Sequence, residues 1–96
     1  MNWSANLAWR IEVTDTAKKQ LAKFDRQVQL EIMRYLREKI ATEEDPRRHG
    51  APLRRELLGR WKYRAGAYRI ICEIQDEKVL VLVLMAGHRS KVCGRH

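Results

Sequence analysis

The sequence predicts a small α+β domain in which a hairpin of two helices packs on one face of an antiparallel sheet. Three observations lead to this fold class. A strand-like run near the N-terminus precedes a long stretch with helical spacing, a proline-containing connection follows, and the chain then holds three strand-like runs with short separators. With 96 residues, 45% of them hydrophobic, residues 1–96 are expected to form a single domain.

The N-terminal half is predicted as one strand followed by two helices. Residues 7–13, LAWRIEV, alternate apolar and polar side chains and include aromatic and β-branched types, as strands do. Thr14 or Asp15 is expected to cap the next helix, because a short side-chain oxygen accepts hydrogen bonds from free backbone N–H groups. Apolar residues then recur at steps of three and four as far as Ile40, and a break near Asp25 divides this stretch into two helices.

The C-terminal half is predicted as a three-stranded meander. Residues 43–55, EEDPRRHGAPLRR, contain both prolines and form the long connection. The runs GRWKYR, YRIICEIQ and KVLVLVLMA follow, separated by AGA and DE. Such separators are too short for parallel pairing, which needs a crossover of about a dozen residues or more. The last run is apolar on both faces, so its strand is expected to be central.

The positive charge of the chain is concentrated in its second half. Residues 1–45 contain eight Lys/Arg and eight Asp/Glu, whereas residues 46–96 contain twelve and four, which supplies the whole net charge of +8. A one-sided positive field attracts polyanions, which favours nucleic acid or an acidic protein as partner. The alternative is a basic surface that only keeps the protein soluble, but such a surface would distribute its charge more evenly. The N-terminus resembles no signal peptide and no apolar run is long enough to span a membrane, so a soluble, cytoplasmic protein is expected.

Neither metal nor cofactor chemistry is indicated. Cys72 and Cys93 lack CxxC spacing, which favours free thiols over a disulfide. The three histidines show no ligand spacing and lie on a cationic background, so no metal site is predicted. No cofactor is expected either, because no glycine-rich phosphate-binding loop joins a strand to a helix.

Strand parity separates the cations of the first meander strand from its aromatic residues. A period of two places Arg60, Lys62 and Arg64 on one face and Trp61 and Tyr63 on the other. The aromatic side chains are expected to pack on the helices. The cations are therefore expected on the face that the helices leave open.

Arg69 joins these cations if the next strand pairs so that it lies opposite Arg64. Like charges directly across a sheet are destabilising unless an anion lies between them. Cations that merely solubilise the sheet explain Lys62 well but explain a converging arginine pair poorly. The GHR stretch after the last strand is expected to carry His88 and Arg89 to the end of the sheet, where nearby arginines favour a neutral His88 as an acid–base group near pH 7.

These stretches together resemble the RelE/ParE toxin superfamily, and its RelE branch in particular. The resemblance rests on Leu57 to Gly59 before a basic strand, on AYRI at 67–70, and on GHR at 87–89, and it covers nearly the whole chain in element order. It implies a toxin of a type II toxin–antitoxin module that acts as a ribosome-dependent endoribonuclease and cuts mRNA in the A site. In that reaction the 2′-hydroxyl of the RNA attacks the adjacent phosphate, and no metal is required.

The resemblance also implies roles for individual residues. Lys62 and Arg64 match the basic pair of the second strand, and Arg69 and Arg89 match the arginines that flank the phosphate. Further cations are implied to bind the RNA: Arg47, Arg48, Arg54, Arg55, Arg60, Lys91 and Arg95.

Cys93 is a departure from the family, because ribosome-dependent relatives usually carry a tyrosine there. Neighbouring cations lower the pKa of a thiol, which makes Cys93 a candidate base. His88, His96 and Lys62 are the alternatives for the acid–base role.

The implied partners are a cognate RelB-like antitoxin and the 70S ribosome with its mRNA. The antitoxin is expected to wrap the domain with an amphipathic helix and to place acidic or apolar groups over the cationic groove. Two other functions stay open: a ParE-like inhibitor of DNA gyrase with the same fold, and a non-catalytic nucleic-acid-binding module. The retained cations argue against the first and Cys93 argues for it, while Trp61 and Tyr63 lie on the wrong face for a stacking platform of the second.

Overall fold

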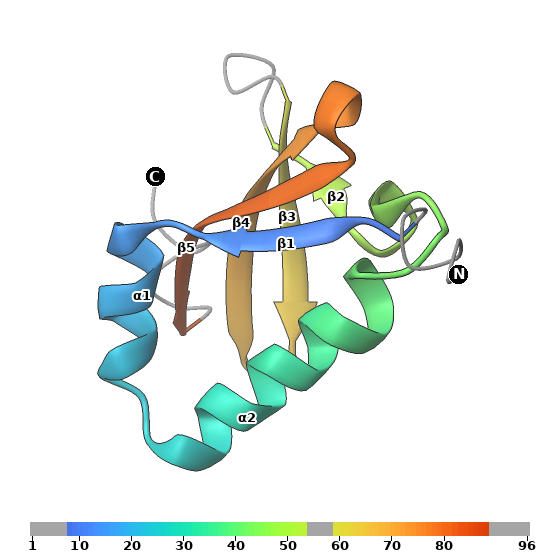
Figure 1. Cartoon of the computed structure of the whole chain (residues 1–96). Coiled ribbons are helices and arrows are strands. Elements are labelled where there is room, and N and C mark those ends of the chain that lie inside the picture. Colours follow the sequence, from blue (N-terminus) through green and yellow to red (C-terminus); the bar gives the residue numbers. More distant parts are fainter. Residues whose placement is uncertain (1–7, 54–58, 89–96) are drawn as a thin grey trace, which may run out of the picture.

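The computed structural model describes residues 8–53 and 59–88 of the chain. The strands are β1 (Arg10–Val13), β2 (Ala51–Pro52), β3 (Arg60–Ala65), β4 (Tyr68–Gln75) and β5 (Leu80–His88). They form one sheet in the order β1-β5-β4-β3-β2, in which β1 runs parallel to β5 and all other neighbours are antiparallel (Figure 1). The predicted α+β class is confirmed.

The N-terminal half follows its local sequence signals closely. Helices α1 (Asp15–Ala22) and α2 (Arg26–Tyr35) are separated at Asp25, as predicted, and a π-helical turn (Leu36–Ile40) extends α2. The Asp25 carboxylate caps α2 by accepting a hydrogen bond from a backbone N–H of its first turn. Strand β1 begins at Arg10 and is therefore shorter than the predicted range 7–13.

Thr14 both caps α1 and fixes it to the sheet. Its hydroxyl accepts a hydrogen bond from the Ala17 N–H at 3.2 Å and donates one to the Val83 carbonyl of β5 at 2.9 Å. The Thr14 side chain therefore holds the start of α1 against β5, the strand that pairs with β1. Of the two predicted capping residues, Thr14 is the one used.

The three-stranded meander is confirmed, and two further strands join it. Gly66 has a φ of +63°, which suits the tight turn between β3 and β4. Strand β5 lies between β1 and β4, so the prediction of an interior strand is confirmed. The middle strand of the five is β4. The parallel pairing of β1 and the short edge strand β2 were not predicted.

The core lies between the helices and one face of the sheet, as predicted. Fully buried side chains from the helical segment pack with those of the central strands in one cluster. Its largest members are Tyr63, Ile32, Leu36, Ile40, Ile70, Val81, Val83 and Cys72. Burial raises the pKa of the Cys72 thiol to about 12, which keeps the thiol protonated inside the core. No helix in the described parts of the chain is long and apolar enough to cross a bilayer.

A bulge in β5 changes which of its side chains face the helices. Cys72 pairs with Val83 and Ile71 pairs with Met85, so Leu84 has no partner of its own on β4. A single extra residue reverses the alternation of every later side chain in the strand. Residues after Leu84 therefore point to the faces opposite to those that uninterrupted alternation predicts.

Candidate functional site: a cationic pocket

Three predicted cations line one pocket on the face of the sheet that the helices leave open. Arg64 of β3 lies directly opposite Arg69 of β4, and Lys62 is on the same face of β3. Together with residues 49–51 and Tyr63, they line a pocket of about 340 Å³. The conditional prediction that Arg64 and Arg69 meet across the sheet is confirmed.

The guanidinium group of Arg69 lacks acceptors and a counter-charge among the described residues around it. Its Nη1 atom is shielded from solvent and has no hydrogen-bond partner among the described residues. A shielded charged donor without an acceptor is unfavourable, and Arg64 opposite it adds repulsion. Within residues 8–53 and 59–88, Lys62, Arg64 and Arg69 take part in no ion pair. An anion bound in the pocket would relieve both penalties.

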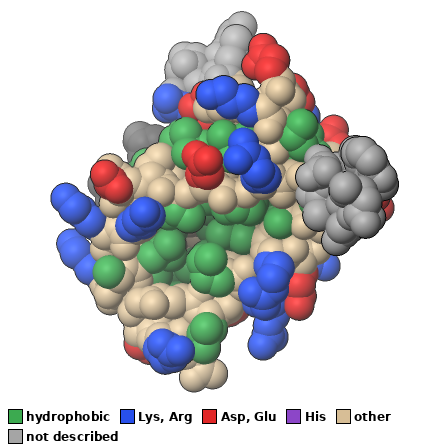
Figure 2. Space-filling model, in the orientation of Figure 1, with side chains coloured by type: hydrophobic (Ala, Val, Ile, Leu, Met, Phe, Trp, Pro, Cys, Tyr) green, Lys and Arg blue, Asp and Glu red, His purple; other side chains and the backbone are tan. Residues whose placement is uncertain are grey.

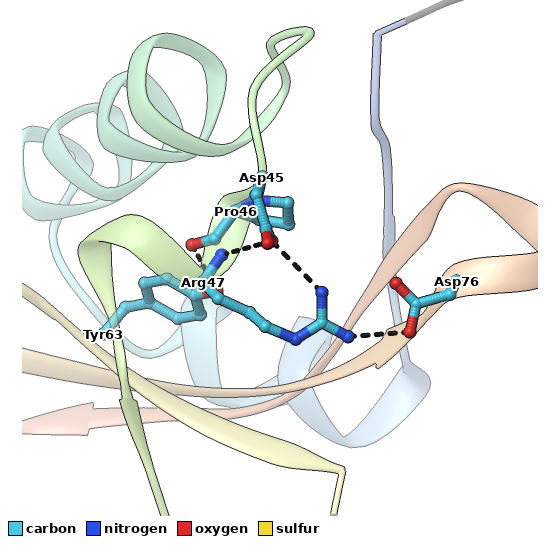
Figure 3. A network of polar contacts seen from close by, with 5 residues as sticks. All are labelled: Asp45, Pro46, Arg47, Tyr63 and Asp76. Atoms are coloured by element: carbon cyan, nitrogen blue, oxygen red, sulfur yellow. Dashed lines mark hydrogen bonds and ion pairs between the residues drawn. The ribbon is translucent and has the colours of Figure 1, made fainter.

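The wall of the pocket beside β3 is held by a polar network (Figure 3). The Tyr63 hydroxyl donates to the Pro46 carbonyl at 2.9 Å. The Arg47 guanidinium donates to Asp45 at 3.1 Å and to Asp76 at 2.7 Å. These bonds tie the 3₁₀ turn Pro46–His49 to β3 and to the turn between β4 and β5.

The electrostatics of this network fix its protonation. Burial foremost, and then the nearby Cys72 and Tyr35, raise the pKa of Tyr63, so its hydroxyl stays a donor. The hydrogen bond with Asp76 is the largest cause that raises the pKa of Arg47. Arg47 is therefore a permanent cation, and Figure 3 shows both of its carboxylate partners beside it.

Gly50 brings the connection unusually close to β3. A Cβ atom there would lie 2.7 Å from the Tyr63 ring and 3.1 Å from the Lys62 carbonyl oxygen, so no larger residue fits without movement. The next residue, Ala51, pairs with Lys62 in the ladder between β2 and β3. The connection therefore forms one side of the pocket rather than a distant loop.

Several residues predicted to bind RNA or to act in catalysis lie away from the pocket or outside the described residues. Arg47 and Arg48 form ion pairs with Asp45, Asp76 and Glu44, and Arg60 is exposed at the other end of β3, opposite Glu73. Their roles stay predictions. The predicted site residues outside the described residues are Arg54, Arg55, Arg89, Lys91, Cys93, Arg95 and His96.

His88 lies on the helix side of the sheet, away from the three pocket cations. It pairs with Tyr68, and the two rings meet edge to face with their centroids 5.5 Å apart. Tyr68 in turn packs against Phe24 and the core. The bulge at Leu84 is the cause, because uninterrupted alternation along β5 would have placed His88 on the cationic face.

The part of the pocket that the long connection supplies was not predicted from the sequence. His49, Gly50 and Ala51 were assigned to an irregular connection, and none of them was singled out. The available signal was the HG dipeptide directly after PRR, which places an imidazole and an unhindered backbone at the end of a basic turn. Among the described residues, no group of three or more His, Cys, Asp or Glu side chains converges as metal ligands.

Comparison with known proteins identifies the family. Residues 11–92 match the family described as ParE toxin of type II toxin–antitoxin system, parDE. The chain belongs to this toxin family. The predicted membership of the RelE/ParE superfamily is thereby confirmed, and this protein is a type II toxin of that superfamily.

Relatives with RelE-type names are similar to this toxin in sequence and in structure. Toxin RelG of Mycobacterium tuberculosis is 32% identical over 89 residues, which cover 93% of this chain and all of RelG. A RelBE toxin–antitoxin complex of M. tuberculosis matches with a TM-score of 0.79 and 30% identity, over 88% of this chain and 95% of that one. A variant of E. coli toxin RelE in the free state gives 0.69 and 26%, over 88% and 87%.

Proposed function

We propose that this toxin is a ribosome-dependent endoribonuclease that cuts mRNA in the A site. The observation that carries the proposal is the pocket in which Lys62, Arg64 and Arg69 converge without carboxylate partners among the described residues. The shielded, unpartnered Nη1 of Arg69 supports an anionic ligand there. A phosphodiester of RNA carries the charge and the oxygen acceptors that such a pocket accommodates.

The chemistry needs positive charge more than any other group. When the 2′-oxygen attacks the adjacent phosphorus, the bond to the 5′-oxygen breaks, and a 2′,3′-cyclic phosphate and a 5′-hydroxyl are left. Negative charge grows on the phosphate oxygens during attack, and arginine holds two of them with its planar fork. Each preorganised donor to such an oxygen is typically worth about 10² to 10³ in rate. Arg69 takes this role here, with Arg64 and Lys62 beside it, and Arg89 is assigned to it by resemblance.

Inhibition of DNA gyrase is the second candidate function. It is favoured by the description of the matching family, which is that of ParE toxins. The RelE-type names of the relatives at 32% and 30% identity favour mRNA cleavage instead. A reaction on ribosomes separates the two.

The test uses purified toxin and ribosomes that hold a defined mRNA, with cuts mapped by primer extension. We expect cuts at the A-site codon when ribosomes are present and none on the same mRNA alone. The Arg69→Ala variant serves as the matched control, and its cuts should be strongly reduced. Absence of cuts with active ribosomes, together with gyrase trapped on cleaved DNA, would overturn the proposal in favour of the ParE-type function.

A RelB-like antitoxin is the proposed protein partner. Figure 2 shows apolar side chains gathered at the centre of one face of the molecule, with Lys and Arg and also some Asp and Glu around them. Half-buried residues packed on the helix-side core include Leu21, Phe24, Val28 and Tyr68. An amphipathic helix matches such an apolar centre, and acidic flanks on it suit a chain with a net charge of +8.

Co-expression tests this partner. The toxin is produced with the product of a small acidic open reading frame next to its own, and the pair is purified through a tag on the second protein. We expect a stable complex in which mRNA cleavage is suppressed. A toxin that is produced at high level, stable and harmless to cells without any partner would contradict the proposal.

A further inference from the structure

The described pocket needs a group that removes the proton of the attacking hydroxyl, and three of its lining residues are unsuited to this task. Arg64 and Arg69 line the pocket with guanidinium groups, which carry hydrogen-bond donors and no acceptor. Lys62 likewise offers donors in its ammonium form. These three cations attract and stabilise the phosphate, but a proton acceptor has to come from another side chain.

Tyr63 is excluded as this acceptor by its own contacts. Its hydroxyl donates to the Pro46 carbonyl at 2.9 Å, and the side chain is almost fully buried, with 1% of its surface exposed. Burial also raises its pKa, so the phenolate is not formed near neutral pH. Gly50 and Ala51, which also line the pocket, have no functional group.

His49 is the remaining lining residue with a polar side chain. Neutral imidazole carries one nitrogen with a free lone pair, and histidine is the side chain whose ordinary titration range includes neutral pH. His49 is exposed, and it lines the same pocket as Lys62, Arg64 and Arg69. His49 thus shares the lining of the pocket with three cations. Its backbone carbonyl accepts a hydrogen bond from the Tyr35 hydroxyl at 3.5 Å.

The backbone of His49 is held firmly, which a proton-transfer group requires. It ends the 3₁₀ turn Pro46–His49, in which the Gly50 N–H donates to the Arg47 carbonyl at 3.2 Å. Tyr63 holds the start of this turn, and the ion pairs of Arg47 with Asp45 and Asp76 hold its middle. The close approach of Gly50 to the Tyr63 ring holds the residue that follows.

We propose that His49 is the general base of the cationic pocket, an inference that rests on the proposed RNA cleavage. Its imidazole takes the proton of the 2′-hydroxyl as the 2′-oxygen bonds to phosphorus. The bond from phosphorus to the 5′-oxygen breaks, and that oxygen takes a proton from the Lys62 ammonium. The imidazolium and the neutral amine then exchange protons with water, which restores both groups.

The test compares His49→Gln and His49→Ala with wild type in the ribosome assay, as single-turnover cleavage rates. Glutamine keeps a polar side chain but accepts no proton at neutral pH, so both variants should lose about 10²-fold or more in rate. Co-sedimentation with ribosomes and the far-UV spectrum should match wild type. Added free imidazole should restore part of the rate of His49→Ala and none of that of Arg69→Ala.

Different failures are distinguishable in this experiment. If wild type does not cleave, the proposed function itself fails and the inference falls with it. If wild type cleaves, Arg69→Ala does not, and His49→Gln is as fast as wild type, the cleavage stands and His49 is not the base. Loss of ribosome binding in parallel with the rate, or no rescue by imidazole, also overturns the assignment, because each points to a role in binding alone. A greater loss in His88→Gln than in His49→Gln would transfer the role to the other described histidine.

Discussion

Arg47 and Arg69 lie in two regions of the molecule that differ in how the charge of an arginine is compensated. Arg47 contacts two carboxylates, at 2.7 and 3.1 Å, and its guanidinium lies 5.8 Å from the centre of the Trp61 ring. Arg69 faces another arginine and has one shielded nitrogen without a partner among the described residues. One region has its charge compensated within the fold and the other keeps it available for a ligand.

The difference shows that the ion pairs that stabilise the fold and the unpaired cations of the pocket lie at separate places. Among the described residues 46–53 and 59–88, no carboxylate lines the pocket: Asp76 follows β4, and Glu73 lies opposite Arg60. Arg47, which is held by its ion pairs, orients the connection that carries His49. Arg69, whose charge is not compensated, offers that charge to an anion. Substitutions in the first region should therefore lower stability, whereas substitutions in the second should lower activity.

The largest effect is expected for Arg69. Arg69→Ala should lower the rate of mRNA cleavage by about 10²- to 10³-fold, because it removes a donor to the developing oxyanion. The midpoint of urea unfolding should stay the same or rise, since an unmatched, partly shielded charge is removed from the fold. Arg69→Lys should give an intermediate rate, because the charge remains but the fork is lost. If Arg69→Ala lowers stability and leaves the cleavage rate unchanged, Arg69 supports the fold as Arg47 does, and the contrast between the two regions is wrong.

Gly50 tests how closely the anchored connection approaches β3. Gly50→Val should destabilise the protein by about 1–3 kcal/mol in urea unfolding, because the added atoms meet the Tyr63 ring. Gly59→Ala is the comparison: nothing lies within 4 Å of a Cβ there, and its φ of +86° gives a purely backbone penalty of roughly 1 kcal/mol. If Gly50→Val is as stable as wild type, the connection is not packed against the ring.

Tyr63→Phe removes the hydrogen bond that holds the start of the connection. The Pro46 carbonyl loses its donor, so we expect a loss of about 1 kcal/mol in the free energy of unfolding, with the core packing of the ring kept. The cleavage rate should fall only modestly, since no group that contacts the phosphate is changed. A rate loss as large as that of Arg69→Ala would instead assign the hydroxyl to the chemistry.

The smallest effect is expected for the ion pair between Arg47 and Asp76. Both side chains are partly exposed, so Asp76→Asn should lower the free energy of unfolding by about 1 kcal/mol or less. The difference from wild type should shrink as salt is added, because exposed pairs are screened. Thermal unfolding at low and high salt measures it. A salt-independent loss would mean that the contribution of Asp76 is not electrostatic.

Most of the fold was predictable because its signals are local. Helical spacing, the break at Asp25, the Thr14 cap and the short turns of the meander all act between residues close in sequence. The parallel pairing of β1 with β5 was not predictable in this way, because about 70 residues separate the partners. The two-residue strand β2 is too short for any periodic pattern.

The cationic half of the pocket follows from the local sequence alone. Strand parity placed Lys62 and Arg64 on one face, and the tight turn at Gly66 brought Arg69 opposite Arg64. Both are consequences of the two-residue period of a strand and of hairpin geometry, which need no knowledge of the rest of the chain.

Which histidine lines the pocket with these cations depends instead on long-range packing. The bulge at Leu84 turns His88 to the helix side, and the packing of Gly50 on Tyr63 brings the turn that carries His49 to β3. A bulge depends on how one strand fits its neighbours, and the path of a connection depends on what it packs against. Neither is encoded in the period of the local sequence.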